Sequence, residues 1–211
     1  MGADYLFRRK GPLAISAANA GAFFKTRPEL ATPDIQVHFI MFSADKMGQA
    51  LHPFSGFSAS ICQLRPESRG SVHIKSSEPA SPPAIRINYM ATELDRQTNV
   101  DGLRRLRSII HADPMRPYLA REVTPGPDVE SDADLLAYCR EAGSTIYHPT
   151  STCAMGTEDT AVVTPDLKVN GVTGLRVADG SVMPRLVSGN TNAAIVMIAE
   201  KASDMILADA P

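Results

Sequence analysis

The sequence predicts a globular fold of the α+β class, because strand-like and helix-like segments occupy largely separate parts of the chain. Short alternating segments rich in β-branched and aromatic residues lie before residue 88, and apolar residues at helical spacing follow it. The 211 residues are 44% hydrophobic and 21% charged, which excludes a disordered or collagen-like chain. Sixteen prolines and 14 glycines indicate many fixed turns.

The first 90 residues contain the segments expected to form strands. Residues 1–34 predict an extended, turn-punctuated segment, and residues 35–42 predict the first clear strand. Residues 57–64 and 71–75 both alternate, and we expect them to pair as a hairpin across the Ser-Arg-Gly turn between them. After three closely spaced prolines, residues 85–87 predict one more short strand.

A long helix is predicted after Asn88 and Tyr89. Its expected buried face consists of Val100, Leu103, Leu106, Ile109 and Ile110. Three arginines, at positions 104, 105 and 107, lie largely off this face, and we expect them to form a solvated basic flank.

Two further helices have recognisable ends. Ser131 is expected to cap the first of them, with Asp134 as the acid of a capping box and Gly143 as its terminator. The second is expected over residues 192–207. Between the two helices, Val169 and residues 175–178 predict short buried strands.

Charge and hydropathy exclude several classes of partner. The formal net charge of −2 gives no electrostatic basis for binding nucleic acid or an anionic membrane surface. No apolar stretch approaches the roughly 20 residues that a transmembrane helix needs. The first residues show no secretory signal, and Cys62, Cys139 and Cys153 are odd in number and widely spaced. We therefore expect a cytoplasmic protein, without disulfides and without a transmembrane segment.

Several chemical motifs are absent or incomplete. The chain has neither G-x-G-x-x-G nor G-x-x-x-x-G-K-[ST], so no phosphate-binding glycine loop is predicted. The segment from Gly56 to Ser60 resembles a serine nucleophile elbow but lacks its final glycine. No C-x-x-C or H-x-x-x-H pair supports a metal site.

The stretch from Tyr147 onward contains the residues best suited to chemistry. His148 lies on a loop fixed by Pro149 and rich in Ser and Thr, as expected of a histidine held in place as a general base. The Asn190-Thr191-Asn192 cluster directly precedes an apolar helix, whose first N–H groups attract negative charge. Taken alone, this cluster is better explained as the cap of the helix.

Four blocks in this order resemble the C-terminal portion of the glucose-methanol-choline (GMC) family of FAD-dependent oxidoreductases. The blocks are Tyr147–Gly156, Pro165–Val172, Gly174–Pro184 and Ser188–Ala193. The resemblance is dense over residues 147–202 and looser upstream, and it is strongest to the choline and alcohol dehydrogenase branch. It implies a mostly antiparallel sheet backed by helices, over residues 1–145, as the substrate-binding portion. Residues 146–211 would then supply the catalytic loop and the last strand and helix of the FAD domain.

The resemblance also implies roles for single residues. His148 and Asn190 would be the catalytic pair beside the flavin, acting on an alcohol of the choline type or another primary alcohol. Asp179 and Gly180 match the segment that contacts the ribityl and pyrophosphate part of FAD. Asn192 and Ala193 match the start of the helix near the flavin ring, where we expect Asn192 to act as a helix cap.

The chain departs from the family in lacking the Rossmann half with its glycine motif. We therefore expect a fragment, a truncated product or one subunit of a split enzyme, with a separate N-terminal Rossmann half as a partner and no activity alone. A different class stays open, namely a catalytically silent module that only binds a partner. A neighbouring reading frame encoding a Rossmann half would favour the enzyme.

Overall fold

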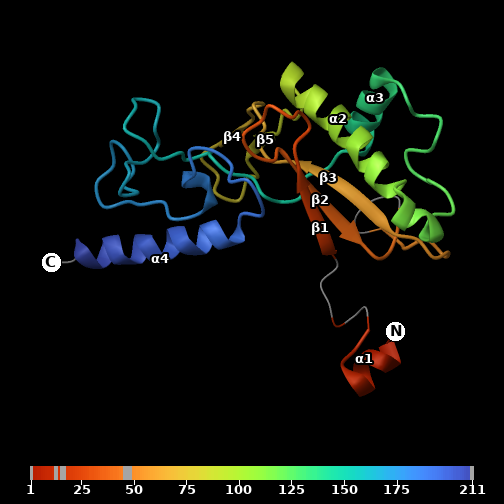
Figure 1. The fold of residues 1–211 in the computed structure, drawn as a ribbon. Helices are drawn as coiled ribbons and strands as arrows, with labels where there is room; N and C mark the ends of the chain where they lie inside the picture. The colour runs from red at the N-terminus through yellow and green to blue at the C-terminus, as the bar shows by residue number, and fades with distance from the viewer. Residues whose placement is uncertain (1, 12–13, 15–17, 45–48, 210–211) are drawn as a thin grey trace. The chain divides into compact units, whose positions relative to one another are not determined.

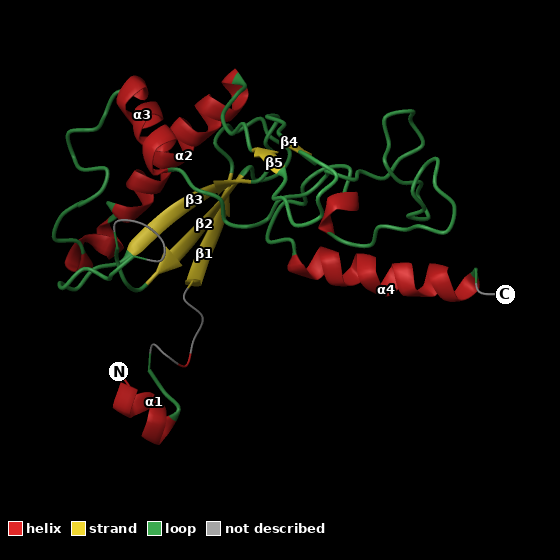
Figure 2. Ribbon diagram, turned by 180° about the vertical axis from the view of Figure 1, so that it is seen from behind, coloured by secondary structure: helices red, strands yellow, loops and turns green. Residues whose placement is uncertain are grey.

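The computed structural model describes residues 2–11, 14, 18–44 and 49–209, which divide into two compact units. The first unit consists of Met1–Gln63 and Thr92–Gly143, and the second unit of Leu64–Ala91 and Ser144–Pro211. Their elements are seen from two sides in Figure 1 and Figure 2. The mixture of antiparallel strands and helices confirms the predicted α+β class. The division of roles between residues 1–145 and 146–211 stays a prediction.

The first unit is built on a three-stranded antiparallel sheet in the order β1-β2-β3. Its strands are β1 (Ala18–Phe24), β2 (Ile35–Ile40) and β3 (Ser58–Gln63). The central strand β2 is the most buried because it pairs on both sides, and Ile35 and Val37 form a core with Leu106. Strands at residues 35–42 and 57–64 are confirmed, each slightly shorter than expected.

Helix α2 (Glu93–Ile110) packs on strand β3, as the apolar spacing of its sequence predicts. Val100 and Leu106 of the predicted face are buried, whereas Ile109, also expected there, is exposed. Gly102 is the point of close approach, since a Cβ there would lie 2.9 Å from the Cδ1 atom of Ile61 and 3.1 Å from that of Ile35. A short 3₁₀ helix, η2 (Asp113–Tyr118), follows, and then α3 (Asp132–Ala142). Ser131 caps α3 and Gly143 ends it, so both predicted ends are confirmed.

Two arginines of α2 do more than form a solvated flank. Arg104 and Arg105 are exposed as expected, but Arg107 is not, so the expectation was wrong for Arg107. The Arg107 guanidinium donates to Glu122 at 2.7 Å and to the carbonyl of Gly126 at 2.9 Å. Arg104 forms an ion pair with Asp132 at the start of α3. These arginines tie the long α2–α3 connection to α2, a role that helical periodicity alone does not reveal.

Two strand predictions need correction. Strand β4 (Ser71–His73) pairs with β5 (Ala84–Arg86) and not with β3, because β3 belongs to the first unit whereas β4 and β5 both belong to the second. The described part of residues 1–34 holds helix α1 (Gly2–Arg8) and strand β1, instead of a wholly extended segment. Residues 1, 12–13 and 15–17 of that stretch lie outside the described residues. Strand β1 consists mostly of small residues, so no polar–apolar alternation marks it.

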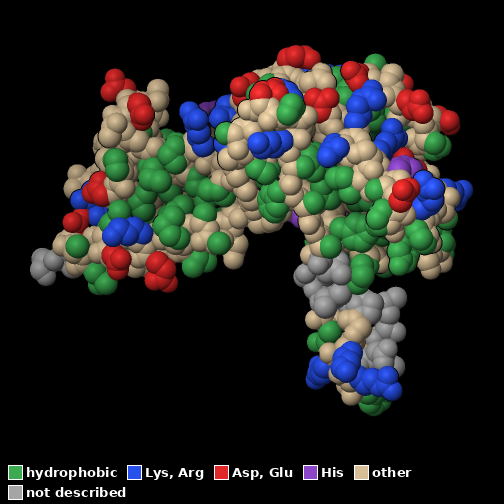
Figure 3. Space-filling model, in the orientation of Figure 1, with side chains coloured by type: hydrophobic (Ala, Val, Ile, Leu, Met, Phe, Trp, Pro, Cys, Tyr) green, Lys and Arg blue, Asp and Glu red, His purple; other side chains and the backbone are tan. Residues whose placement is uncertain are grey.

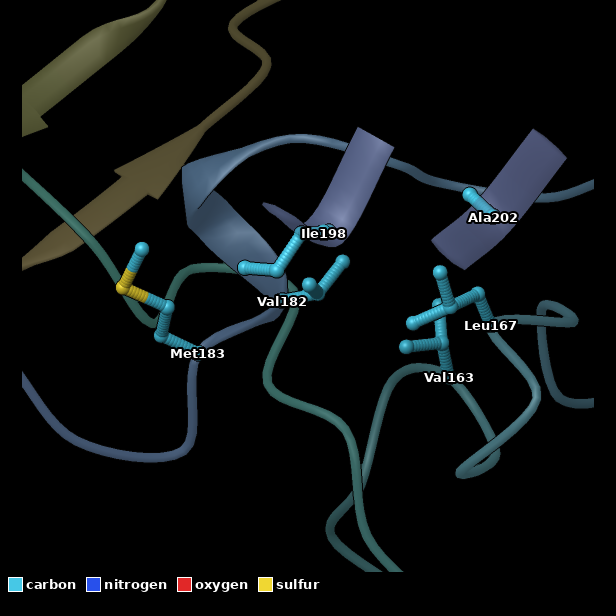
Figure 4. Close-up of a cluster of buried hydrophobic side chains, with 6 residues drawn as sticks. All are labelled: Val163, Leu167, Val182, Met183, Ile198 and Ala202. Carbon is cyan, nitrogen blue, oxygen red and sulfur yellow. The ribbon is translucent and has the colours of Figure 1, made fainter. Parts of the chain in front are cut away.

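The second unit is organised around helix α4 (Asn192–Ala208) and the short 3₁₀ helix η3 (Gly180–Val182). Their shared core, shown in Figure 4, contains Val163, Leu167, Val182, Met183, Ile198 and Ala202. The predicted last helix is confirmed almost to the residue. The buried strands expected at Val169 and residues 175–178 are only isolated bridges, and Leu175 is half exposed, because this segment folds as a chain of tight turns.

Large apolar side chains are also found on the surface, as the green areas on the visible face in Figure 3 show. On the β4–β5 ribbon of the second unit, Val72 lies opposite Ile85, and both are largely exposed. Ile74 and Ile87 extend the same apolar pattern by two residues along each chain. An exposed apolar face of this kind is typical of a surface that is covered in a larger assembly. Among the described residues, no helix has both the length and the apolar character needed to cross a bilayer.

Candidate active site

The loop that carries His148 has an unusual backbone. Tyr147, directly before the histidine, has a φ of 61°, and Ser151, three residues after it, has a φ of 72°. Residues other than glycine rarely adopt this left-handed conformation, and it is kept only where the surroundings determine it. The Tyr147 amide donates to the Thr145 hydroxyl at 3.0 Å, and Pro149 restricts the backbone of His148 to extended values. Local structure therefore fixes where His148 lies.

The same loop is tied to the core of the second unit by backbone hydrogen bonds to η3. The Cys153 amide donates to the carbonyl of Ser181 at 3.0 Å, and the Met155 amide to the carbonyl of Val182 at 2.9 Å. The side chain of Val182 packs in the core shared with α4. The loop and the N-terminus of α4 are consequently held on one framework.

This framework brings the two predicted catalytic residues into contact. The Asn190 side-chain nitrogen lies 2.9 Å from Nε2 of His148, although 42 residues separate them in sequence. The other ring nitrogen, Nδ1, lies 3.0 Å from the hydroxyl oxygen of Thr191. His148 is half-buried and Asn190 is exposed, so the pair is accessible from solvent.

The partners of the imidazole define its protonation. An amide NH₂ group only donates, so in this arrangement Nε2 accepts from Asn190 through its lone pair. The proton of the neutral ring then lies on Nδ1, which donates to the Thr191 hydroxyl. Nε2 is therefore the basic atom of the site, and it faces the exposed side chain of Asn190.

Thr191 is the site residue that sequence reasoning missed. It stands at the N-cap position of α4, yet its side chain caps no N–H group of the helix. Its position next to the asparagines suggests a cap, and nothing in the sequence shows that His148 comes close. The capping role expected for Asn192 was wrong, because Asn192 is already the first helical residue and lies on the exposed side.

The predicted cofactor-binding residues gather around the start of α4. The Asp179 carboxylate accepts from the Ser181 amide at 2.7 Å and thereby caps η3. Gly180 is buried, and a Cβ there would lie 3.1 Å from the Cδ1 atom of Ile195 and 3.9 Å from the carbonyl oxygen of Pro149. The backbone at residue 180 therefore lies against both the first turn of α4 and the His148 loop.

The N-terminus of α4 keeps its positive electrostatic character. The first N–H groups of any helix lack intrahelical partners and carry the positive end of the helix dipole. No acidic residue lies in the first turn of α4, and Asn192 and Ala193 are both exposed. Among the described residues, no group of three or more His, Cys, Asp or Glu is placed to hold a metal ion. The N-terminus of α4 is thus suited to an anionic group close to His148.

Comparison with known proteins agrees with this geometry. A family model described as GMC oxidoreductase matches residues 66–199, which is more than half of the chain and includes the whole His148–Asn190 pair. The chain belongs to the GMC oxidoreductase family. The match is to the C-terminal portion of these flavoproteins.

Curated relatives of this GMC chain are similar along almost its entire length. It is 42% identical over 206 residues to an oxygen-dependent choline dehydrogenase of Pseudomonas putida, covering 98% of this chain and 36% of the relative. It is 41% identical over 204 residues to an alcohol dehydrogenase [acceptor] of Pseudomonas putida, covering 97% of this chain and 37% of the relative. The chain spans little more than a third of the length of these relatives.

Solved structures share the fold. Pyridoxine 4-oxidase from Mesorbium loti superimposes with a TM-score of 0.83 at 27% identity, covering 92% of this chain and 39% of the other. Formate oxidase from Aspergillus oryzae gives a TM-score of 0.87 at 24% identity, over 99% of this chain and 41% of the other, which is a likeness of fold alone.

Proposed function

We propose that this chain provides the catalytic C-terminal portion of an FAD-dependent oxidoreductase that oxidises the CH–OH group of a primary alcohol, of the choline type or another. The observation that carries the proposal is the contact between Nε2 of His148 and the side chain of Asn190 at an accessible position. The similarity to a choline dehydrogenase and an alcohol dehydrogenase supports the class of substrate.

His148 is the proton acceptor in this proposal. The alcohol hydroxyl approaches Nε2, the ring nitrogen whose lone pair is available once the amide of Asn190 moves aside. Nε2 takes the hydroxyl proton, and the resulting imidazolium keeps its Nδ1–H bond to Thr191. A hydride would leave the carbon atom that bears this hydroxyl group for the flavin of a bound FAD, so the alcohol would become an aldehyde.

Asn190 changes partner during this reaction. Its NH₂ group, released from Nε2, is free to donate to the alcohol oxygen as negative charge develops there. Removing a donor of this kind costs about 2.7–4 kcal/mol of transition-state stabilisation in other enzymes. The exposed position of Asn190 is compatible with this exchange of partners.

The residues around the start of α4 fit the flavin part of FAD, which supplies the hydride acceptor when bound. The first turn of α4 has no acidic side chain, so its N–H groups at Asn192 and Ala193 favour the negative charge of a reduced flavin. Gly180 lies against the same turn, and Asp179 directly precedes it; both would contact the ribityl and pyrophosphate region. These 211 residues contain no glycine motif for the ADP part, so the proposal requires a Rossmann half in addition to them, in the same polypeptide or in a partner.

A reducing compartment, with the cytoplasm as the expected location, also belongs to the proposal. Its support is that Cys62, Cys139 and Cys153 are all free thiols. Alkylation of freshly lysed cells should count three free thiols. Disulfide-linked chains in such a lysate would contradict the location.

Co-expression with the N-terminal half of a related oxidoreductase tests the function. The chain alone should purify colourless, and the assembled protein should show a flavin absorbance spectrum that is bleached anaerobically by choline or another primary alcohol. A yellow isolated chain with stoichiometric flavin would contradict the need for a Rossmann half. An assembled flavoprotein that no alcohol reduces would favour the silent binding module instead.

A further inference from the structure

Thr191 has an unusual position for a threonine at the start of a helix. It is 3% exposed, its backbone has a φ of −82° and a ψ of −15°, and its hydroxyl caps no N–H group of α4. A threonine at the N-cap ordinarily has an extended backbone and accepts from the second or third N–H group of the helix. The hydroxyl of Thr191 is directed instead to Nδ1 of His148, at 3.0 Å.

The two hydrogen bonds of the imidazole differ in whether they can persist when a substrate binds. The contact from Asn190 to Nε2 must open before a substrate hydroxyl reaches that atom, and Asn190 is exposed. The contact from Nδ1 to Thr191 is on the buried side of the ring and does not compete with substrate. When Asn190 moves away, Thr191 is the side-chain partner that remains within the described part of the chain to distinguish one ring nitrogen from the other.

We propose that Thr191 is a positioning residue, whose hydroxyl holds His148 as the Nδ1–H tautomer and so keeps Nε2 as the proton acceptor. The inference rests on the proposed function of His148. It explains why the hydroxyl of a buried threonine at a cap position caps no N–H group of the helix, since local rules of structure are commonly broken at functional sites. It also adds a role to the site that neither the motif nor the spacing of residues 190–192 reveals.

The tautomer can be measured in this chain without any cofactor. In a sample labelled with ¹⁵N-histidine, at a pH where the ring is neutral, His148 should show a protonated Nδ1 and an unprotonated Nε2. The His148→Ala spectrum assigns its signals among those of the five histidines. Thr191→Val removes the hydroxyl at nearly constant volume and should shift the tautomer ratio toward Nε2–H by about 2- to 13-fold, the effect of one ordinary hydrogen bond. Thr191→Ser should restore the native ratio.

Ser131→Ala is the matched control, because it also removes a hydroxyl from an N-cap position, in the first unit. It should leave the ring nitrogens of His148 unchanged. In the assembled flavoprotein, Thr191→Val should slow flavin reduction by the alcohol, and Thr191→Ser should recover the native rate.

Three results would overturn the inference: a native ring protonated on Nε2, a Thr191→Val variant with the native tautomer ratio, or an unchanged rate of flavin reduction in that variant. If Thr191→Val fails to fold, the native spectrum and the Thr191→Ser variant still decide it. Failure of the proposed function has a separate sign, which is normal flavin reduction by the alcohol in a His148→Ala protein.

Discussion

The starts of the helices in the two units use the same kind of residue for different purposes. In the first unit, the hydroxyls of Thr92 and Ser131 accept from the amides of Asp95 and Asp134 and cap α2 and α3. In the second unit, Thr191 stands at the equivalent place on α4, but its hydroxyl contacts His148. A residue type that signals only a helix start in sequence thus serves stability in one unit and the candidate active site in the other.

The largest effect that this comparison predicts is on the rate of flavin reduction when His148, the residue that the Thr191 hydroxyl contacts, is replaced. In an assembled flavoprotein, His148→Ala should slow flavin reduction by the alcohol about 10²- to 10⁴-fold, because the proton acceptor is lost. Flavin content should change little, since the contacts proposed around Asp179 and Asn192 are untouched. Stopped-flow absorbance of the flavin under anaerobic conditions measures the rate.

The control for this variant is His111→Ala, which removes an exposed histidine of the first unit whose Nδ1 contacts the carbonyl of Arg107. It should leave flavin reduction at the native rate. Equal rates for native protein and His148→Ala would remove His148 from the mechanism. The contact of the Thr191 hydroxyl with His148 would then have no role in catalysis.

The next effect separates the two asparagines on either side of Thr191. Asn190→Ala should slow flavin reduction by about 10²- to 10³-fold, as loss of an oxyanion donor does in other enzymes. Asn192→Ala should weaken flavin binding more than the chemical step. Because Asn192 is a helical residue and not the cap, this variant should leave the unfolding midpoint unchanged or slightly raised, alanine being the better helix former.

Single-turnover reduction rates and thermal melts of both variants provide the measurement. Slow flavin reduction in Asn192→Ala, together with a native rate in Asn190→Ala, would reverse the proposed roles of the two asparagines. It would contradict the proposal that the contact between Asn190 and His148 is the basis of the site.

Features of this structure that depend on residues close together in sequence are predicted well, and features that depend on residues far apart in sequence are not. The apolar spacing of α2, the cap at Ser131 and the stop at Gly143 are local patterns, and the structure confirms them. The hairpin expected between residues 57–64 and 71–75 is wrong, because the chain passes from one compact unit to the other between these strands. Choosing the partner of β3 needs long-range information that alternation does not contain.

The same limit applies to the site. The motif order around His148 and Asn190 predicts their pairing, and the structure brings them within 2.9 Å. Thr191 shows no distinguishing feature in sequence, since its function depends on a ring nitrogen 43 residues away. Similarly, the ion pair from Arg107 to Glu122 connects residues whose spacing fits no local pattern.

A smaller effect concerns the helix caps themselves. Ser131→Ala should lower the free energy of unfolding by about 0.5–2 kcal/mol, because α3 loses the acceptor for its Asp134 amide. Thr191→Val should cost less than this, since no helix N–H group depends on its hydroxyl. Urea unfolding followed by circular dichroism compares the two variants. Equal losses of stability would mean that Thr191 acts as an ordinary cap.

The smallest effect is expected at the opposite end of α4, which is held by charged groups. Asp209, just after the helix, pairs with Lys168 at 2.7 Å and with Arg176, and Lys168 also pairs with Asp166 at 3.0 Å. The hydrogen bond from the Thr164 hydroxyl, together with Lys168, lowers the pKa of the Asp166 carboxyl to about 2. Lys168 likewise lowers the pKa of Asp209.

A carboxyl whose pKa is lower in the folded than in the unfolded chain stabilises the fold above its unfolded pKa, about 3.9 for aspartate. That contribution is lost as the pH falls through the folded value, so thermal stability of the native chain should decline between about pH 4 and pH 2. Asp166→Asn should make this decline shallower, whereas Asp159→Asn, an exposed carboxylate on the same loop, should not. Because these side chains are exposed, the difference should be small and should shrink further as salt is added. Parallel declines in all three proteins would show that the charged groups at the C-terminal end of α4 do not stabilise it, and that the apolar core alone holds both ends of the helix.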